Sequence, residues 1–281
     1  VEALRRALAE AGWEQGRNLT IDVGWYRGNY QIAQEIARRL LNSGAEVIVV
    51  NGTPGMDALR AAGATLPIVF VVVSNPVGAG YVSNLARPGQ NITGFSTFEP
   101  EIVGKWLQIL RQVQPELKHV SMLLDPKFVG FQSLWQALED VASQFSIAAT
   151  PAFASTLEEI ETEIEKVAAI GNSALIVAPS PVNTVNRLRV IELTNQRRLP
   201  AIYPFRFYVR DGALVAYGFN AADQFRRAAN YVDRILKGEE PGSLPIQAPS
   251  LFEMGVNLKT AKSLGIVVPQ SLLISADEIV E

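Results

Sequence analysis

The sequence predicts an α/β fold with two lobes, each built on a doubly wound parallel sheet and joined by a hinge of several strands. Three observations predict it. Strand and helix signals alternate along the chain, and several strand candidates are unbroken apolar runs, such as EVIVV at residues 46–50 and PIVFVVV at 67–73. Unbroken runs indicate strands that helices cover on both faces. The second half of the chain then repeats this series, which indicates two sheets rather than one.

The first lobe is expected over residues 1–95. Its elements, in order, are a helix over 1–12 that ends at a glycine, a strand over 18–23, a helix with Ile32, Ile36 and Leu40 on one stripe, a strand over 46–50, a helix over 54–62 and strands over 67–73 and 91–95. In a doubly wound sheet of order 2-1-3-4-5 the first strand is central, and its loss would leave buried backbone groups unpaired. We therefore expect that a strand precedes Val1 in the natural protein and is missing from this numbering.

The second lobe repeats the series. Its elements are helices over 101–113, 156–169 and 182–197, a helix with Leu134, Leu138, Val141 and Phe145 inward, and strands over 120–124, 146–150, 174–178 and 201–203. The stretches GAEVIVVNGTPGMDAL and NSALIVAPSPVNTV share the order strand, Pro-bearing turn and helix, and each leads to a Leu-Pro and another strand. This similarity indicates an approximate duplication.

The chain is expected to cross between the lobes more than once. Residues 213–219 return it to the first lobe, where a helix over 221–237 precedes a Pro-rich connection over 238–249. The predicted boundaries are 1–95 plus 218–246 for lobe 1, and 96–217 plus 247–281 for lobe 2. Crossings near 95, 217 and 247 would form a hinge of several parallel strands.

Composition excludes several functional classes. The 25 basic and 28 acidic residues give a net charge of -3, without a cluster of Lys and Arg to bind nucleic acid. There is no cysteine, and the single histidine, His119, is expected to be an ordinary surface or edge residue. Gly78 and Gly80 lack the rest of a dinucleotide fingerprint, and no phosphate loop or nucleophile elbow occurs. We expect no catalysis, no metal and no cofactor. No apolar run reaches the roughly 20 residues of a membrane span.

The ends of the predicted strands carry small hydrogen-bonding residues. In open α/β sheets, ligands bind beyond the carboxyl ends of the strands, where helix N-termini offer free N–H groups. Such a polar edge suits a small molecule, with neutral donors for a carboxylate and aromatic side chains for an apolar body. The predicted ligand-binding residues are Gly52, Thr53, Ser74, Asn75, Pro76, Phe95, Thr97, Asp125, Ser180, Tyr203, Phe205 and Arg206.

Several of these residues have a structural interpretation as well. Thr53 has the position of an N-cap for a helix that begins at Pro54, a role that is compatible with an anion site at the same helix end. Ser74 and Asn75 have the residue types that cap a following turn. Both interpretations stay open at this point.

The residues after the last strand of the second lobe have alternatives too. Tyr203, Phe205 and Phe207 alternate and so face one side, which is typical of a core as well as of a ligand shelf. Arg206 is either a bidentate clamp for a carboxylate or a surface residue paired with Asp211 or another carboxylate.

The sequence also resembles a known family. SNPVGAG, NITGFS, AIYPFRFYVRDGALVAYG and NLKTAKSLG, together with GTPGMDALRAA and the C-terminal PQSLLISADEIVE, resemble substrate-binding proteins of ABC importers of the tryptophan/tyrosine-binding type, a branch of the type I periplasmic binding fold. The resemblance covers the whole chain. It implies a non-enzymatic, two-lobed receptor in the periplasm or another extracytoplasmic space, which closes on a small molecule and delivers it to a membrane permease. We expect it to be a monomer.

The resemblance leaves the ligand open. Amino-acid-binding members place acidic residues at the positions of Asn75 and Thr97 and near Arg206, where this chain is neutral or basic. Asp125 is then the obvious partner for an ammonium group, and Arg206 favours an additional carboxylate. An aromatic or apolar carboxylate is the first expectation, and an aromatic or branched amino acid is its competitor. A cytosolic ligand sensor of the same fold is the alternative function, and an enzyme is the third.

Overall fold

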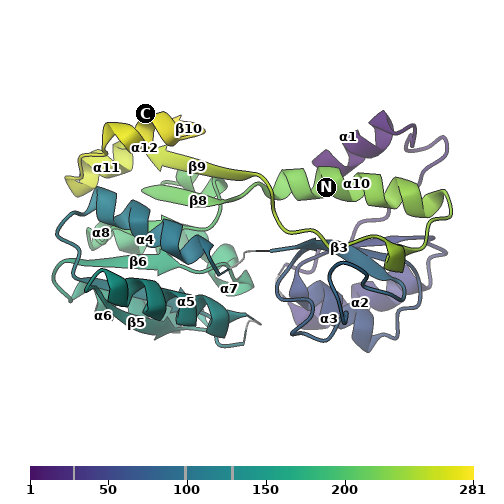
Figure 1. The fold of residues 1–281 in the computed structure, drawn as a ribbon, viewed down its shortest axis with the longest axis horizontal. Coiled ribbons are helices and arrows are strands. Elements are labelled where there is room, and N and C mark those ends of the chain that lie inside the picture. Colours follow the sequence, from purple (N-terminus) through teal and green to yellow (C-terminus); the bar gives the residue numbers. More distant parts are fainter. Residues whose placement is uncertain (28, 98–99, 128–129) are drawn as a thin grey trace. The chain divides into compact units, whose positions relative to one another are not determined.

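The computed structural model describes residues 1–27, 29–97, 100–127 and 130–281. It is an α/β protein with mainly parallel sheets, as predicted, and it divides into two compact units (Figure 1). Unit 1 contains the described residues up to 97 and residues 220–251. Unit 2 contains the described residues from 100 to 219 and residues 252–281.

Unit 1 is built on a parallel sheet of β1 (Ile48–Asn51), β2 (Ile68–Val73) and β3 (Ile92–Ser96), in that spatial order. Helices α2 (Tyr30–Leu41) and α3 (Thr53–Ala61) pack on one face. There Ile68 and Phe70 lie in a buried cluster, called the α2/α3 cluster, with Ala33, Ala37, Met56 and Leu59 of the helices. Helices α1 (Glu2–Glu10) and α10 (Ala221–Leu236) pack on the other face. There Val69 and Val71 lie in a second buried cluster, called the α1/α10 cluster, with Leu4, Leu8, Ala228 and Val232 of the helices. Successive residues of β2 thus point to opposite faces, and both faces are covered, as the unbroken apolar runs predicted.

One prediction for unit 1 is wrong, and another is wrong in part. Residues 18–23 do not form a strand, and the only bridge in this segment that the described residues show is between Gln15 and Leu19. Leu19 and Ile21 pack against the α1/α10 cluster, so their apolar alternation reflects burial of an extended segment rather than strand pairing. In the stripe predicted for α2, Leu40 packs against the core as expected, but Ile32 is 39% exposed, and Ala33 and Ala37 are the buried residues of the helix.

Unit 2 has a larger sheet, whose strand order in the described residues is β10-β9-β8-β7-β6-β4-β5. Its strands are β4 (His119–Leu124), β5 (Ala148–Phe153), β6 (Ser173–Val177), β7 (Ala201–Tyr203), β8 (Val215–Phe219), β9 (Phe252–Asn257) and β10 (Glu278–Val280). Neighbouring strands are parallel except β8 and β9, which are antiparallel. Strands β9 and β10 were not predicted from the sequence.

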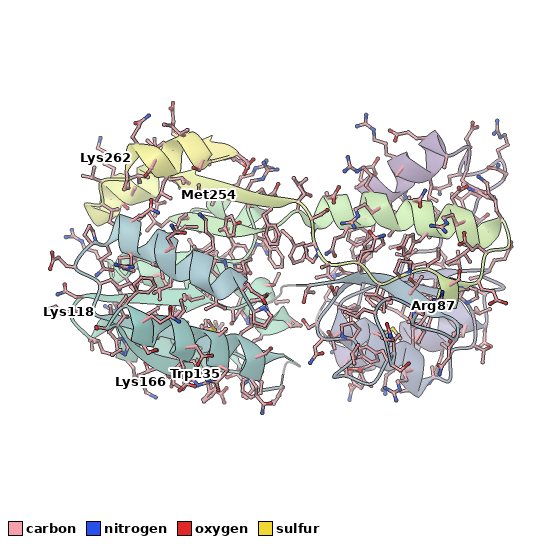
Figure 2. All side chains as sticks on the ribbon, in the orientation of Figure 1. Arg87, Lys118, Trp135, Lys166, Met254 and Lys262 are labelled. Atoms are coloured by element: carbon pink, nitrogen blue, oxygen red, sulfur yellow. The ribbon has the colours of Figure 1, made fainter. Side chains whose placement is uncertain are left out.

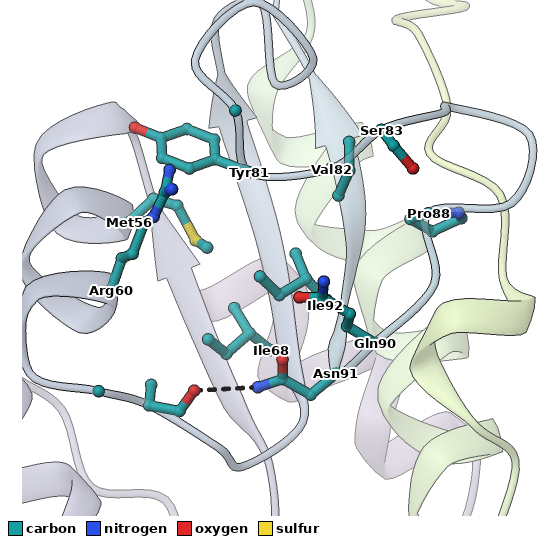
Figure 3. Close-up of a pocket in the computed structure, with 13 residues that line it drawn as sticks. Met56, Arg60, Ile68, Tyr81, Val82, Ser83, Pro88, Gln90, Asn91 and Ile92 are labelled. Atoms are coloured by element: carbon teal, nitrogen blue, oxygen red, sulfur yellow. Dashed lines mark hydrogen bonds between the residues drawn. The ribbon is translucent and has the colours of Figure 1, made fainter.

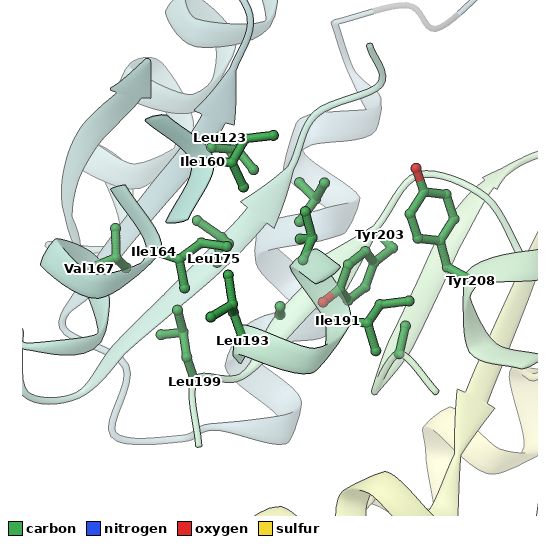
Figure 4. Close-up of a cluster of buried hydrophobic side chains, with 14 of the residues drawn as sticks. Leu123, Ile160, Ile164, Val167, Leu175, Ile191, Leu193, Leu199, Tyr203 and Tyr208 are labelled. Atoms are coloured by element: carbon green, nitrogen blue, oxygen red, sulfur yellow. The ribbon is translucent and has the colours of Figure 1, made fainter. Parts of the chain in front are cut away.

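Helices cover both faces of this sheet as well. They are α4 (Ile102–Val113), α5 (Phe131–Gln144), α6 (Leu157–Ala168), α7 (Pro181–Val185), α8 (Arg187–Gln196), α9 (Phe207–Arg210), α11 (Leu258–Leu264) and α12 (Gln270–Ser275). Ile160 and Ile164 of α6 and Ile191 of α8 pack with Leu123 and Leu175 of the sheet on one face (Figure 4). Helices α4 and α5 lie on the opposite face (Figure 1). The helix predicted over 156–169 is therefore confirmed, and Ile160 and Ile164 form part of its buried side.

The stripe predicted for α5 is wrong in part. Leu134 and Leu138 are buried as expected, but Ala142 completes the stripe, while Phe145 is 44% exposed. The guanidinium carbon of Arg111 lies 4.0 Å from the centre of the Phe145 ring, so a cation covers the ring where we expected the core. The predicted helix over 182–197 is divided into α7 and α8 at Asn186.

The repeated series corresponds to a repeated structure. In unit 1, β1, α3 and β2 form a strand–helix–strand unit with parallel strands, and Pro54 stands in the first turn of its helix. In unit 2, β6 and β7 are also parallel neighbours, and Pro181 begins the intervening α7. This agreement supports the predicted duplication.

The boundaries between the units lie a few residues later in the chain than expected. Strand β3 continues to Ser96, and the N–H of Thr97 donates to the carbonyl of Val73 at 3.0 Å. Phe95 forms a bridge with Gln247, whose carbonyl accepts from the Ser96 N–H at 3.0 Å. Residues 96–97 and 247–251 therefore belong to unit 1.

The outer surface is charged, and the interior of each sheet is apolar. Lys118, Lys166 and Lys262 are exposed and point outward from unit 2, whereas Met254 of β9 is buried (Figure 2). Within the described parts of the chain, no helix has the length and apolarity needed to cross a bilayer. Among the same residues, no group of three or more His, Cys, Asp or Glu side chains is arranged to hold a metal ion.

Candidate functional site

Three hydroxyl-bearing residues meet where the strands of unit 1 end. Thr53 follows β1, Ser74 follows β2 and Thr97 follows β3, and their exposed fractions are 3%, 8% and 6%. The Ser74 N–H donates to Thr53 Oγ1 at 3.3 Å, and the Ser74 and Thr97 hydroxyls are 2.9 Å apart in a hydrogen bond. We call these three residues the hydroxyl row. The structure thus brings together three of the predicted site residues from three separate segments.

The hydroxyl row adjoins the N-terminus of α3. Gly52, with φ of 80°, is the N-cap, and Thr53 is the first residue of the helix. Of the two interpretations of Thr53, the N-cap does not hold, because Gly52 occupies that position and the Thr53 hydroxyl accepts from the Ser74 N–H across the sheet edge. The first-turn amides of an α-helix have no acceptor within the helix, and they carry a partial positive charge. This end of unit 1 is suited to an anionic group such as a carboxylate.

Gly52 has little room for a side chain. Its positive φ is unfavourable for other residues, and a Cβ there would lie 3.1 Å from the Tyr26 hydroxyl oxygen. Tyr26 donates that hydroxyl to the carbonyl of Asn51 at 3.0 Å, and partial burial raises the pKa of the phenol. Tyr26 is not among the residues predicted from the sequence. The sequence feature that could have pointed to Tyr26 is the aromatic pair Trp25-Tyr26, which lies just after residues 18–23, the segment predicted to be a strand.

The other predicted residues of unit 1 have structural roles. Asn75 is exposed, and its Oδ1 accepts from the Gly78 N–H at 2.9 Å, as the turn-capping interpretation expected. Pro76 is buried in the same turn, and its carbonyl accepts from the Tyr81 N–H. Phe95 is 1% exposed, and its ring centre lies 5.0 Å from that of Tyr231. We leave Phe95 out of the proposed site because its ring belongs to the α1/α10 cluster.

In unit 2, Asp125 follows β4 at the corresponding sheet edge. Its Oδ1 accepts from the Ser155 hydroxyl at 2.7 Å and from the Lys127 N–H at 3.0 Å. Ser155, which the sequence analysis missed, lies just beyond β5. In the described parts of the chain no Lys or Arg side chain forms an ion pair with Asp125. This partly buried carboxylate at the sheet edge is therefore held by one hydroxyl and one backbone amide.

Ser180 is 5% exposed, and its hydroxyl accepts from the Asn183 N–H at 3.1 Å as the N-cap of α7. Asn183 is fully buried and donates its side-chain amide to the carbonyls of Leu123 and Ala178, at 3.3 and 2.8 Å. These bonds hold the ends of β4 and β6 together. Ser180 is thus a structural part of the edge.

Two predicted aromatic residues of unit 2 lie in or against its core. Tyr203 is 1% exposed among apolar side chains (Figure 4), and its hydroxyl forms a 2.8 Å hydrogen bond with that of Thr194. Burial raises the pKa of this phenol. Phe205 is partly buried and stacks on Phe207, with ring centres 5.7 Å apart, and Phe207 is 42% exposed. The stack of Phe205 and Phe207 therefore leads from the core to the surface. Tyr203 is left out of the proposed site because its side chain is buried in the core.

Arg206 is engaged within unit 2. Its Nε lies 3.3 Å from a Glu253 oxygen and 3.4 Å from a Glu278 oxygen. Arg210 also binds Glu278, and this bond, with the charges of Arg210 and Arg206, lowers the pKa of the Glu278 carboxyl. Of the two interpretations of Arg206, the structure shows the pairing with other carboxylates. Asp211, the partner first considered, is paired with Arg187 at 2.7 Å.

A cavity of about 480 Å³ lies elsewhere in unit 1, between α3 and the segment that leads into β3 (Figure 3). Met56, Arg60, Tyr81 and Asn91 line it, and none of the predicted site residues does. The Arg60 guanidinium donates to the Ala79 carbonyl at 3.2 Å. The cavity is thus distinct from the hydroxyl row.

His119 is buried rather than on the surface. It is 8% exposed, its Nε2 lies 3.1 Å from the Thr150 hydroxyl, and burial lowers its pKa. The prediction of a surface residue was wrong because β4 is a central strand with neighbours on both sides.

Comparison with known proteins identifies the family. Residues 1–280 match the family model described as ABC transporter substrate binding protein. The chain belongs to this family. A crystal structure of a conserved domain protein from Vibrio cholerae O1 biovar El Tor is 30% identical, covers 99% of this chain and 93% of that one, and superposes with a TM-score of 0.91.

Two further proteins with similarity to this chain are more distant in sequence. The ABC domain from Streptococcus pneumonia in complex with L-Trp is 21% identical, with 99% of this chain and 93% of that chain covered and a TM-score of 0.91. A tyrosine-binding protein from Clostridioides difficile is 24% identical over 92% of this chain and 74% of its own length. The family and the type I periplasmic binding fold are thereby established for this substrate-binding protein.

Proposed function

We propose that this protein is the solute-binding component of an ABC importer and that it captures a small carboxylate-bearing molecule with an aromatic or apolar body. The hydroxyl row beside the N-terminus of α3 is the observation that carries the proposal. It combines hydroxyl groups with first-turn amides at one sheet edge, and these groups suit a carboxylate without offering a nucleophile and base for catalysis. The proposed protein is therefore a receptor that binds its ligand without catalysing a reaction.

Within that class, an amino acid is favoured over a simple acid. Arg206 is already paired with two carboxylates, so it no longer argues for an additional acid group on the ligand. Asp125 has no cationic partner in the described residues. A carboxylate without such a partner is suited to bind the ammonium group of a ligand. The names of the relatives, one bound to L-Trp and one called tyrosine-binding, support an aromatic side chain.

The transport role follows from family membership. We propose that the two units, which the chain connects by three crossings, close on the ligand and that the closed form delivers it to a membrane permease. An extracytoplasmic location and a monomeric state belong to the same proposal. The family match supports import over the alternative, the effector domain of a cytosolic regulator.

A titration panel tests the proposal. Isothermal titration of purified protein with L-tryptophan, L-tyrosine, L-leucine, indole-3-acetate and benzoate should detect binding of at least one compound, with an aromatic amino acid tightest. The same ligand at 100 times its dissociation constant should add about 2.7 kcal/mol to the free energy of unfolding. Absence of binding and of stabilisation across the whole panel would contradict the proposed ligand class.

A further inference from the structure

Val72 has a backbone conformation that is unusual for its residue type. Its φ is +58°, in the left-handed region, which is costly for β-branched side chains. It is the next-to-last residue of β2 and stands two positions before Ser74 of the hydroxyl row. Strained backbone of this kind persists only where the surroundings hold it, and it is common near binding sites.

The strain accompanies a bulge that reverses the direction of the following side chains. Strand pairing runs from Val71 with Phe95 to Val73 with Ser96, so Val72 is an extra residue in β2. Val71 packs in the α1/α10 cluster and Val72 packs against the same cluster, whereas Val73 belongs to the α2/α3 cluster. A regular strand would have placed Val73 on the α1/α10 side and Ser74 on the opposite one.

The reversal puts Ser74 on the side of Thr97. Phe95 lies in the α1/α10 cluster, and in an extended strand Thr97, two residues on, points to the same face. With the bulge, Ser74 points to that face too, and its hydroxyl meets Thr97 at 2.9 Å. The hydroxyl row therefore depends on the bulge.

One buried side chain holds the bulge. Gln224, in the first turn of α10, is 1% exposed, and its Oε1 accepts from the Val72 N–H at 3.1 Å. Its Nε2 donates to the carbonyl of Ser96 at 2.7 Å. The single side chain thus bonds β2 at the extra residue and β3 at the residue next to Thr97. A buried N–H or carbonyl left without its partner would be costly.

We infer that Gln224 is a positioning residue, which holds the Val72 bulge and so aims the Ser74 hydroxyl at Thr97 in the binding edge. The role rests on the proposed function, because its purpose is to shape the site for a carboxylate. Gln224 itself does not touch the ligand. Its substitution acts through Ser74.

The test compares two variants that each remove a side-chain amide from unit 1. Gln224→Met keeps the length of the side chain and removes both hydrogen bonds. Asn91→Leu removes an amide that donates to the carbonyls of Leu66 and Ala64, at 2.7 and 3.3 Å, at the start of β3 (Figure 3). Dissociation constants for L-tryptophan are measured by calorimetry, and stability is measured by urea denaturation.

Both variants should lose stability, but only Gln224→Met should weaken binding, by about tenfold or more, the scale of one to two hydrogen bonds. Unchanged affinity of Gln224→Met would overturn the inference. So would an equal loss of affinity in Asn91→Leu, since that result would mean that loss of stability alone weakens binding.

A second arm needs no ligand. In the free protein, hydrogen exchange at the Val72 amide should be faster in Gln224→Met, and a crystal structure of the variant should show the Ser74 and Thr97 hydroxyls out of hydrogen-bond distance. An unaltered bulge with the 2.9 Å contact intact would overturn the inference. If wild-type protein does not bind L-tryptophan, the ligand in the proposed function is wrong, and this arm still decides the role of Gln224.

A rescue variant separates positioning from simple core filling. Glycine adopts positive φ without strain, so Val72→Gly should allow the bulge to persist without its support. The double variant Gln224→Met/Val72→Gly should therefore bind L-tryptophan more tightly than Gln224→Met does. Its dissociation constant should lie within about threefold of that of Val72→Gly alone, which is less than the loss of one hydrogen bond would cause. No rescue would contradict the inference. If Gln224→Met alone does not fold, the double variant is compared with Val72→Gly, and a tenfold gap between them would contradict it.

Discussion

At the scale of single residues, Ser74 takes part in both hydrogen bonds of the hydroxyl row and so connects its three members. Its N–H is directed to Thr53 and its hydroxyl to Thr97. All three residues are at least nine-tenths buried, which limits the rotamers that each hydroxyl can adopt. A ligand carboxylate would therefore meet donors that are already oriented, and little ordering would remain for the binding step.

The first prediction concerns Thr97. Thr97→Val keeps the shape of the side chain and removes the partner of the Ser74 hydroxyl, so the affinity for the proposed amino-acid ligand should fall about threefold to tenfold. Thr93→Val is the matched control in the same strand, because it removes a buried hydroxyl that donates to the Leu244 carbonyl at 2.8 Å. Calorimetry should show the wild-type dissociation constant for the control. Equal effects of the two variants would contradict a binding role for the row.

The residues of this row could be predicted from the sequence because they follow strand signals directly. Ser74 comes immediately after one unbroken apolar run and Thr53 three residues after another, and the carboxyl ends of parallel strands meet at one edge. Gln224 could not be predicted, since it lies far along the chain in an ordinary amphipathic helix. Tyr203 and Phe95 were placed in the site on strand position alone, which does not reveal the face to which a side chain points.

At the scale of elements, the close approach of β2 and β3 makes Gly94 essential. Gly94 has a φ of +152°, and a Cβ there would lie 2.1 Å from the Phe70 carbonyl oxygen. Gly94→Ala should therefore lower the free energy of unfolding by about 2 to 4 kcal/mol, through a clash with backbone that cannot move aside.

Gly104 in α4 is the matched control for this prediction. A Cβ at Gly104 would meet Val141 at 3.8 Å, an ordinary contact, so Gly104→Ala should be neutral or add up to about 1 kcal/mol through helix propensity. Urea denaturation of both variants tests the pair. A Gly94→Ala protein as stable as wild type would show that the two strands can separate without cost.

The β9–β10 end of unit 2 is predicted to respond to pH. The hydrogen bond from Arg210 and the positive charges of Arg210 and Arg206 lower the pKa of Glu278 below its ordinary value. A carboxyl with a depressed folded-state pKa contributes stability above its unfolded pKa, and the contribution is lost as the pH falls through the folded pKa. Arg210→Gln should therefore unfold at lower urea than wild type at pH 7, and the difference should shrink below about pH 4.

Arg6→Gln is the control for this pH dependence. Arg6 is paired with Glu10 on the surface of α1 at 3.2 Å, and such exposed pairs add little to stability. Its unfolding midpoint should stay near that of wild type at both values of pH. A difference for Arg210→Gln that is constant from pH 7 to pH 3 would contradict the role given to Glu278.

Only some of the strands could be predicted from the sequence. Unbroken runs identified the parallel strands of both units, because burial on two faces removes polar residues from a strand. Residues 18–23 show the limit, since apolar alternation reports burial but not a backbone partner. The antiparallel β9 was not predicted either. Its sequence FEMGVN is half-buried at its start and ends in an N-cap, so it lacks an unbroken apolar run.

At the scale of the whole molecule, two units are connected by three crossings of the chain. Ligand contacts with both units would favour a closed state, as proposed for import. Small-angle scattering should then show a smaller radius of gyration at saturating L-tryptophan than in its absence. D-tryptophan serves as the matched control. A radius unchanged by a ligand that calorimetry shows to bind would contradict closure.

The central claim is that the hydroxyl row and the α3 N-terminus receive the carboxylate of a small aromatic or apolar amino acid. A crystal structure of the protein with the tightest ligand of the titration panel tests it most directly. The account predicts a carboxylate oxygen within hydrogen-bond distance of Ser74 or Thr97, or of a first-turn amide of α3. A carboxylate bound to Arg206, or lodged in the cavity lined by Arg60 and Tyr81, would contradict it.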